Sequence, residues 1–326
     1  MPDTHATADD KFEQYLNTHR FKGQPANLYE PMNYIMQLGG KRMRPRLLLM
    51  AYESTGKTAT DEVMQLAMSI ETFHNFSLVH DDIMDHAPVR RGKPAVHKKW
   101  DEATAILAGD NMLIACYDMI LKTGFADKEA MLSLFTRTAR EVCEGQQMDM
   151  DLPFKAGISE AEYLEMIRLK TAVLPAAALK MGAIAAGLPA QTADTFYEFG
   201  IQLGMAFQMH DDYLDTFGSS DETGKQEGGD ILENKKTLLY LHAIQHLDSN
   251  DKQALNKWYS GRVHDNSEKV KVVRNLFRQA GSDIYLNDIK KGFEEKALTL
   301  LEILDIDSGV KKAFNELLLQ LSSRKS

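Results

Sequence analysis

The chain has 326 residues, 44% of them hydrophobic, and a formal net charge of −9 at pH 7. This apolar fraction is ordinary for a globular protein and is enough to build a sizeable core. The negative charge argues against a nucleic-acid partner, although local clusters of Lys and Arg still allow anionic small molecules to bind.

Apolar residues recur at helical spacing along most of the chain, and alternating runs bounded by hairpin turns are absent. Ser159 and Glu162 form the pattern of a capping box. No linker rich in Pro, Gly or Ser divides the chain. We therefore predict an all-α protein in which residues 1–326 form a single domain, one large helical bundle with ligands in its core. The expected helices are Asp61–Asp85, Asp101–Leu121, Glu129–Gln147, Ser159–Leu174, Ala190–Phe217, Asn234–His246, Ser267–Ala280 and Ser282–Leu304.

Three features favour a cytoplasmic protein without a membrane span. Met1–Asp10 is polar and acidic and lacks the apolar stretch of a signal peptide. Thr171–Ala190 is the most apolar window, but a proline, a lysine and several glycines interrupt it, so we expect a buried helix of small residues. Cys116 and Cys143 have neither disulfide nor metal-binding spacing, and we expect both to be buried, reduced thiols.

One six-residue motif, HDDxxD, occurs twice, as His80–Asp85 (HDDIMD) and His210–Asp215 (HDDYLD), each time after an apolar stretch. On a helix, the first and last Asp of each copy are four residues apart and project from one face. Packing a core does not call for carboxylates that repel each other in this way. Magnesium relieves the repulsion, because it is typically held by one or two carboxylates while substrate phosphates supply further oxygens. A solvated helix end explains one copy equally well, but two copies favour a metal site.

Basic residues accompany both acidic motifs. Gly39–Pro45 (GGKRMRP) combines two glycines with three cations, and Lys170-Thr171 lies in a helix ahead of an apolar run. Taken singly, each Lys or Arg is more often a solvated surface charge. Together with the carboxylates, they are what a complex of metal ions and diphosphate requires, because cations and metals both bind phosphate oxygens. The remaining basic residues near the motifs are Arg90, Arg91, Lys225, Lys235 and Lys236.

With His74 and Gln208 added, this set of residues resembles the trans-prenyltransferases, the short-chain all-trans polyprenyl diphosphate synthases of the farnesyl and geranylgeranyl diphosphate synthase type. The resemblance runs from about Leu28 to about Leu239 and includes order, spacing and residue type. It implies an isoprenoid (terpenoid) synthase bundle with a central catalytic cavity. It also implies a homodimer, for which the apolar face of Ala103–Tyr117 offers an interface. The implied reaction condenses isopentenyl diphosphate with dimethylallyl, geranyl or farnesyl diphosphate.

The resemblance also implies roles for single residues. Asp81 and Asp85 would bind Mg2+ that carries the allylic diphosphate, and Asp211 would bind a further ion from the opposite helix. The supporting acids would be Asp82, Asp212 and Asp215. Isopentenyl diphosphate would be held by Lys41, Arg44, His74 and Arg91, and the allylic diphosphate by Arg90, Lys225 and Lys235. The groups near the reacting carbons, where oxygens stabilise an allylic cation, would be Lys170, Thr171 and Gln208.

Two other enzyme classes stay open. Metal-dependent phosphohydrolases of helical fold also use His-Asp pairs, but they give no role to the Asp at the fourth position or to the cluster around Lys41. A class I terpene cyclase shares one DDxxD motif, but its second motif usually mixes Asn, Ser or Thr, and Glu. A subunit without activity predicts the loss of one motif, and both are intact here. We expect His80 and His210 to pack rather than to bind metal.

The residues before the first motif bear on product length. Ser77 lies one helical turn below Asp81 and Phe73 two turns below, with Phe76 beside them, and each turn is about 5.4 Å, comparable with one isoprene unit. In the family, an aromatic at the Phe76 position without a second at the Ser77 position tends to accompany geranylgeranyl-length products. The first motif also lacks the two-residue insertion usual in bacterial farnesyl synthases. We favour geranylgeranyl diphosphate as the product, with farnesyl diphosphate next.

Overall fold

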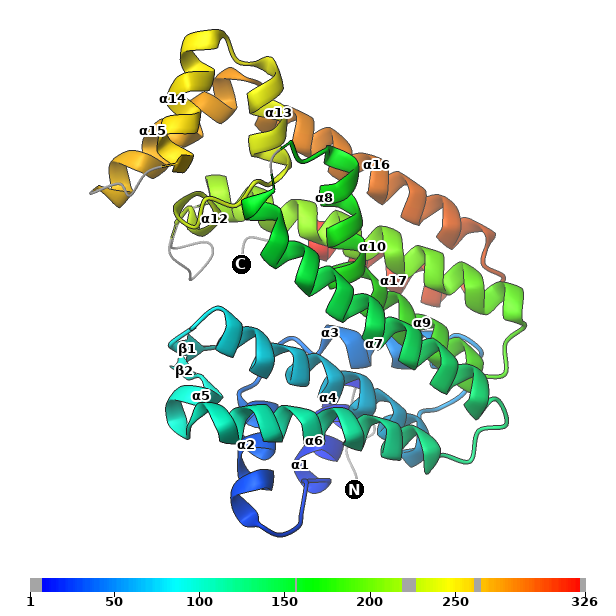
Figure 1. The fold of residues 1–326 in the computed structure, drawn as a ribbon. Helices are drawn as coiled ribbons and strands as arrows, with labels where there is room; N and C mark the ends of the chain where they lie inside the picture. Colours follow the sequence, from blue (N-terminus) through cyan, green and yellow to red (C-terminus); the bar gives the residue numbers. More distant parts are fainter. Residues whose placement is uncertain (1–7, 156, 219–226, 261–264, 323–326) are drawn as a thin grey trace. The chain divides into compact units, whose positions relative to one another are not determined.

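The computed structural model describes residues 8–155, 157–218, 227–260 and 265–322. Contacts between Cα atoms divide the chain into two compact units. Unit 1 comprises Met1–Arg137 and Ala177–Tyr197, and unit 2 comprises Thr138–Ala176 and Glu198–Ser326. The boundaries fall inside α7 (Lys128–Asp151), α9 (Val173–Ala185) and α10 (Ala190–Phe217) (Figure 1). A single domain over residues 1–326 stays a prediction.

Unit 1 is built around α4 (Asp61–Met84), a helix of 24 residues. The side chain of Thr60 caps it by accepting a hydrogen bond from the N–H of Val63, and two acids follow in the first turn. The helix packs against α1, α2, α3, α5 and α6, and it ends shortly before Pro88, which cannot continue a helix (Figure 1). The other elements are α1 (Ala8–Thr18), α2 (Ala26–Gln37), α3 (Met43–Glu53), β1 (Val89–Arg90), β2 (Lys93–Pro94), α5 (Val96–Lys99) and α6 (Glu102–Leu121).

Unit 2 begins with the last part of α7 and contains α8 (Glu160–Ile167). The expected capping box at α8 is confirmed, because Ser159 Oγ accepts from the N–H of Glu162 and the Glu162 carboxylate accepts from the N–H of Ser159. Helix α13 packs against α8, α14, α15 and α16. The other elements are the 3-10 turn η1 (Leu152–Phe154), the π-turn η2 (Arg168–Ala172), α12 (Gly229–Leu232), α13 (Leu238–His246), α14 (Ser249–Ser260), α15 (Asn266–Gln279), α16 (Ser282–Ile303) and α17 (Ser308–Ser322).

The all-α class is confirmed, and the structure corrects three details of the expectation. The predicted helix Ser159–Leu174 is not regular, because a π-turn at Arg168–Ala172 separates α8 from α9. The predicted helix from Asn234 starts only at Leu238, since Asn234 has a left-handed φ of 59°. A short hairpin pairs Arg90 with Lys93 in antiparallel register, and strands of two residues are too short to show an alternating pattern.

The structure also bears on the expected burial of the two cysteines and on the expected absence of a membrane span. Cys116 is buried as expected, but Cys143 is exposed on α7, so the prediction of two buried thiols is wrong for Cys143. Among the described helices, α6 alone is long and apolar enough to cross a bilayer by length and composition, and 33% of its apolar window is buried. The core helix of a soluble protein passes the same test, so the absence of a membrane span stays a prediction.

Candidate active site

The first acidic motif forms the end of α4 in unit 1. Asp82 is fully buried, and the Nε of Arg90 lies 3.0 and 3.2 Å from its two carboxylate oxygens, while Nη2 also donates to Oδ1. Asp81 is half-buried and Asp85 is exposed, four residues apart on one face. The middle aspartate is therefore bound within the protein, and the outer two form a separate pair. The assignment of Arg90 to the allylic diphosphate stays a prediction, since two of its nitrogens donate to Asp82.

The outer pair fits magnesium when a phosphorylated substrate completes the coordination. Among the described residues, no three His, Cys, Asp or Glu side chains gather as a metal-binding group. Magnesium does not need such a cage, because one or two carboxylates suffice where phosphates and waters supply the other oxygens. Asp81 and Asp85 are a donor set of this kind, and the partner of Asp82 keeps the third carboxylate away from the pair.

An arginine cluster, consisting of Arg42, Arg44, Arg90 and Arg91, surrounds His74 in unit 1. The Nη1 of Arg42 donates to the buried carboxylate of Glu71 at 2.7 Å. Arg91 donates to the carbonyl oxygen of Gly39, and a Cβ at the next residue, Gly40, would lie 2.8 Å from the Arg91 guanidinium carbon. The absence of a side chain at Gly40 therefore lets this guanidinium lie directly on the backbone.

The arginine cluster contains one buried N–H group without a hydrogen-bond partner among the described residues, and the pKa values of Arg44 and His74 are lowered there. The Nε of Arg44 is buried without a hydrogen-bond partner among the described residues. Burial lowers the pKa of Arg44 to about 10, with the charge of Glu71 opposing and that of Arg91 adding to the shift. Burial, followed by the positive charges of the cluster, holds the pKa of His74 well below its ordinary value. A neutral imidazole beside several guanidinium groups and an unpartnered N–H fits a bound anion such as a diphosphate.

The residues assigned to product length lie on α4 below the first motif. Phe73 and Phe76 are buried, with ring centroids 5.4 Å apart, and Phe73 contacts Phe135 of α7 edge-on at 5.3 Å. Ser77 is half-buried, and its hydroxyl donates to the carbonyl oxygen of His74 at 2.8 Å. The two phenylalanines therefore belong to one aromatic cluster, in which a change of either ring affects the other.

The histidine of the first motif packs as expected. His80 Nε2 lies 3.2 Å from the carbonyl oxygen of Ile106 on α6, and its ring meets that of Phe76 edge-on. A Cβ at Gly109 would lie 2.2 Å from His80 Nε2, so glycine is needed where α6 passes the imidazole. In unit 2, His210 is buried. Packing against a neighbouring helix accounts for His80 without a metal.

The second acidic motif lies near the end of α10 in unit 2. Asp212 is buried, and it accepts hydrogen bonds from the Tyr163 hydroxyl at 2.6 Å and from Gln208 Nε2 at 2.9 Å. Burial raises the pKa of Asp212 to about 7, and the charges of Asp230 and Asp211 act in the same direction, while the two hydrogen bonds oppose them. Asp211 is half-buried beside this network. As in the first motif, the middle aspartate is bound within the protein.

Lysines of unit 2 pair with further carboxylates near Asp212. Lys170 Nζ lies 2.5 Å from Asp149, and Lys235 Nζ lies 3.1 Å from Asp230. Burial lowers the pKa of Lys235, but the carboxylates of Asp230, Glu233 and Asp149 together raise it above its ordinary value. Lys235 is therefore positively charged at neutral pH and can hold phosphate oxygens.

These groups line a cavity of about 100 Å³ in unit 2. Three carboxylates and three lysines line it, together with the neutral polar side chains of Tyr163, Thr171, Gln208 and Thr237. Charges of both signs, next to an acidic motif, are the expected surroundings of a metal and diphosphate site. The charged lining residues are Asp149, Lys170, Asp212, Asp230, Lys235 and Lys236.

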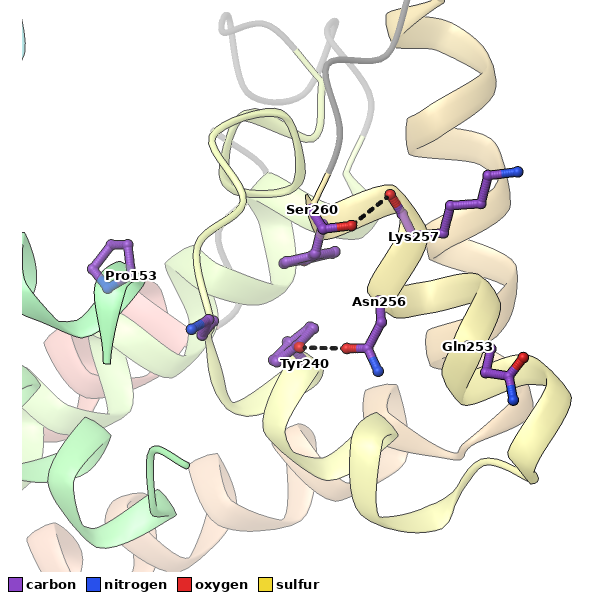
Figure 2. Close-up of a pocket in the computed structure, with 8 residues that line it drawn as sticks. Pro153, Tyr240, Gln253, Asn256, Lys257 and Ser260 are labelled. Atoms are coloured by element: carbon purple, nitrogen blue, oxygen red, sulfur yellow. Dashed lines mark hydrogen bonds between the residues drawn. The ribbon is translucent and has the colours of Figure 1, made fainter. Parts of the chain in front are cut away.

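A second pocket of unit 2, of about 520 Å³, has a different character. Figure 2 shows Tyr240 donating to Asn256, at 3.1 Å, and Ser260 donating to the carbonyl oxygen of Lys257, at 3.4 Å. The side chains of Lys257 and Gln253 point away from Tyr240. Without converging charges, this pocket lacks the chemistry of the cavity around Asp212.

The π-turn places Lys170 and Thr171 beside that cavity. Two glycines allow neighbouring helices to approach the turn closely, because a Cβ at Gly145 of α7 would lie 2.3 Å from the Lys170 nitrogen. A Cβ at Gly204 of α10 would lie 2.6 Å from the Cα of Ala172. π-Turns within helices are frequent at functional sites, and here the turn presents two assigned residues in succession.

The structure thus groups the assigned residues within each unit. Unit 1 holds Lys41, Arg44, Phe73, His74, Phe76, Ser77, Asp81, Asp85, Arg90 and Arg91, and unit 2 holds Lys170, Thr171, Gln208, Asp211 and Lys235. Lys225 lies outside the described residues.

Sequence reasoning missed four partners of these residues, namely Glu71, Asp149, Tyr163 and Asp230. A charged residue three positions before His74 on an apolar helix is a signal for Glu71. No sequence signal joins Tyr163 to Asp212, which is 49 residues away.

Known proteins resemble the chain over most of its length. A solved structure of a geranylgeranyl pyrophosphate synthase has a TM-score of 0.93 at 44% identity and covers 98% of each chain. The geranylgeranyl diphosphate synthase of Methanosarcina mazei is 35% identical over 283 residues, 86% of this chain and 85% of its own. The geranylfarnesyl diphosphate synthase of Natronomonas pharaonis is 41% identical over 237 residues, 68% and 70% of the two chains.

These likenesses identify the class and then the family. The fold is the all-α fold of the isoprenyl diphosphate synthases, in agreement with the expected isoprenoid synthase type. The polyprenyl synthetase model matches residues 25–277, and the chain belongs to this family of prenyltransferases. The resemblance inferred from the motifs is therefore confirmed.

Proposed function

We propose that the protein condenses isopentenyl diphosphate with an allylic diphosphate (dimethylallyl, geranyl or farnesyl) into a short all-trans prenyl diphosphate. One observation carries the proposal. In both HDDxxD copies the middle aspartate is bound inside the protein, by Arg90 in one case and by Tyr163 and Gln208 in the other. The first aspartate of each copy, Asp81 or Asp211, is half-buried next to it and would hold a metal ion.

The residues of unit 1 would bind and orient diphosphate. Magnesium, when bound, neutralises the charge that develops on the leaving diphosphate. Asp81 and Asp85 hold it, with Asp211 holding a further ion. Arg44 and Arg91 hold the diphosphate of isopentenyl diphosphate with Lys41 and the neutral His74, because this cluster has an N–H group without a partner.

The residues of unit 2 would act on the allylic group. Lys235 holds the allylic diphosphate, since it lies with two further lysines in the lining of the cavity beside Asp212, and the family resemblance assigns the same role to Lys225. When the C–O bond breaks, the side-chain oxygens of Thr171 and Gln208 and the backbone at Lys170 face an allylic cation. The double bond of isopentenyl diphosphate attacks this cation to form the new C–C bond, and the diphosphate that has left takes up the proton that is then lost. No nucleophile of the protein takes part.

Elongation by the purified protein tests the proposal. Labelled isopentenyl diphosphate is supplied with each allylic partner, in Mg2+ or in EDTA, and the products are separated by chain length. We expect elongation that requires the metal. Cyclisation of a single prenyl diphosphate would indicate a terpene cyclase instead, and simple release of phosphate would indicate a phosphohydrolase. Either result without elongation contradicts the proposal.

We propose geranylgeranyl diphosphate as the main product, with Phe76 and Phe73 at the end of the tail pocket. Their burial on α4 supports this, as do relatives that are named geranylgeranyl diphosphate synthases. Phe76→Ala and Phe73→Ala should each lengthen the product, because removal of a ring opens the pocket toward the next turn of α4, about 5.4 Å further along the helix. Phe293→Ala, at a half-buried site on α16, is the control. Unchanged length in both α4 variants would exclude this assignment.

We also propose a homodimer formed through α6. Leu107, Ile114 and Leu121 are 59%, 65% and 55% exposed and recur every seven residues, so they form one apolar stripe on the helix. Sedimentation of the wild type and of Ile114→Lys tests this. We expect a dimer that the charged residue weakens, whereas a wild-type monomer at micromolar concentration would contradict it.

A further inference from the structure

A chain of hydrogen bonds connects the second acidic motif to the π-turn. The Tyr163 hydroxyl donates to Asp212 Oδ2 at 2.6 Å, and Gln208 Nε2 donates to Asp212 Oδ1 at 2.9 Å. At the other end of the same amide, Thr171 Oγ1 donates to Gln208 Oε1 at 3.2 Å. Tyr163 and Asp212 are only 5% and 3% exposed, and all four residues line the same cavity.

The chemistry of these groups determines which way the Gln208 amide points. When Asp212 is ionised, its carboxylate only accepts hydrogen bonds, whereas an amide has an NH2 end that donates and an oxygen that accepts. With Tyr163 bonded to one oxygen of Asp212, the other oxygen is directed at Gln208 and requires its NH2 end. The amide oxygen must then point toward Thr171. In the reversed orientation, two acceptors would meet at Asp212 and the NH2 end would face the cavity.

We propose that Tyr163 and Asp212 are positioning residues that fix the amide of Gln208 with its oxygen toward Thr171 and the reacting carbons. This inference rests on the proposed function, in which an allylic cation forms beside Thr171. An amide oxygen stabilises positive charge, whereas an NH2 group in the same place opposes it. Asp212 thus serves the reaction through Gln208, and Tyr163 serves it through Asp212.

Removal of the Tyr163 hydroxyl provides the first test. Tyr163→Phe should lower kcat about 10- to 100-fold, because misplacement of a group near the reacting atoms has effects of this size. KM for both substrates, and the affinity for an unreactive allylic thiodiphosphate measured by calorimetry in Mg2+, should change less than about threefold, since the amide orientation matters mainly when charge develops.

A matched control exists elsewhere in unit 2. The Tyr285 hydroxyl donates to Glu160 at the same distance of 2.6 Å, away from the cavity. Tyr285→Phe should therefore leave kcat unchanged, and thermal unfolding should show that both variants are folded. If kcat falls equally in the two variants, or if Tyr163→Phe retains the wild-type kcat, the positioning role is wrong.

Exchange of the two polar ends gives the sharper test. Gln208→Glu places two carboxylates together, and Asp212→Asn lets the Gln208 amide reverse, so each should lower kcat. In the double variant Gln208→Glu with Asp212→Asn, the Asn NH2 donates to the Glu, the Asn oxygen still accepts from Tyr163, and an oxygen again faces Thr171. We expect the kcat of the double variant to be about tenfold higher than that of the less active of the two single variants.

A ligand role for Asp212 predicts a different pattern. In that case Asp212→Asn raises the Mg2+ concentration needed for half-maximal rate, and the double variant does not recover. That outcome would overturn the inference while leaving the proposed function intact. Failure of the wild-type protein to elongate any substrate would instead remove the proposed function itself.

Discussion

The HDDxxD motif lies at or near the end of a helix in each unit, and its middle aspartate has different hydrogen-bond partners in the two copies. In unit 1, the cation of Arg90 binds Asp82, eight residues away along the chain. In unit 2, two neutral donors, Tyr163 and Gln208, bind Asp212. The same HDDxxD pattern therefore has different electrostatics in the two copies, because the groups that bind the middle aspartate come from residues outside the motif.

The surroundings have opposite sign as well. Burial and the surrounding arginines lower the pKa of His74, whereas burial and the neighbouring carboxylates of Asp230 and Asp211 raise the pKa of Asp212. The arginine cluster of unit 1 therefore favours an anion, and the surroundings of Asp212 favour added positive charge. A diphosphate with its metal ions carries charges of both signs.

The comparison predicts equal importance for the first aspartate of each copy. Asp81→Ala and Asp211→Ala should each lower kcat/KM by about 10²- to 10³-fold, because each removes a carboxylate to which we assign a metal ion at the leaving diphosphate. The rate of elongation as a function of Mg2+ concentration measures this effect. Glu302→Ala, at an exposed acid on α16, should have no effect. If only one of the two motif variants is impaired, the two copies do not share a role.

The ion pair between Arg90 and Asp82 in unit 1 should contribute strongly to the free energy of unfolding. Arg90→Ala leaves the buried Asp82 carboxylate without its partner, and we expect a loss of about 2 kcal/mol in the free energy of unfolding. The double variant Arg90→Ala with Asp82→Asn should recover most of the loss. Urea unfolding measures both, and Lys122→Ala, which breaks the exposed pair with Asp118, should cost at most about 0.5 kcal/mol. An equally small loss for Arg90→Ala would show that the pair is not structurally important.

Acid should stabilise the protein through Asp212. Its pKa of about 7 exceeds the ordinary 3.8, so the folded state binds this proton more tightly than the unfolded chain does. Stability from this group is fully present below the ordinary value and is lost as pH rises through the window to about 7. In EDTA, the difference in unfolding free energy between about pH 5 and about pH 7.5 should contain about 1–2 kcal/mol that Asp212→Asn removes. An identical pH dependence in wild type and variant would contradict this.

Acid should act in the opposite direction through His74. The pKa of His74 is held below the ordinary 6.5, so the unfolded chain binds this proton more tightly. Its contribution to stability is present above 6.5 and declines as pH falls toward the lower folded value. His74→Gln should reduce the loss of stability between about pH 7 and about pH 5 by about 1 kcal/mol, as measured by urea unfolding. A larger loss in the variant than in the wild type would reverse the assigned sign.

The long elements were predictable from the sequence because their apolar pattern persists over many turns. The prediction Ala190–Phe217 agrees with α10 at both ends, and Asp61–Asp85 differs from α4 by one residue. The π-turn at Arg168–Ala172 was not predictable, because one added residue per turn barely changes composition or periodicity. The hairpin after the first motif is also too short to produce a pattern.

The candidate site was predictable only where its residues lie close together in the sequence. The acidic and basic motifs supply most assigned residues, since their spacing is local. Their internal partners are set by tertiary contacts, as the pairing of Lys170 with Asp149 on α7 illustrates. The sequence therefore does not distinguish the middle aspartate of each motif, which is bound within the protein, from the other two.

The π-turn also determines how this part of the chain tolerates a change of length. A π-helix holds about one residue more per turn than an α-helix, in which each residue rotates the direction of the next side chain by about 100°. Deletion of one residue within Arg168–Ala172 would therefore let the turn close as regular α-helix, while the later side chains of α9 keep nearly the same direction. A deletion early in α9 would instead rotate every later side chain by about 100°, so the fully buried Met181 would take the direction of the ion-paired Lys180. The chain should therefore accept the loss of one residue at the π-turn more readily than at a regular position of α9.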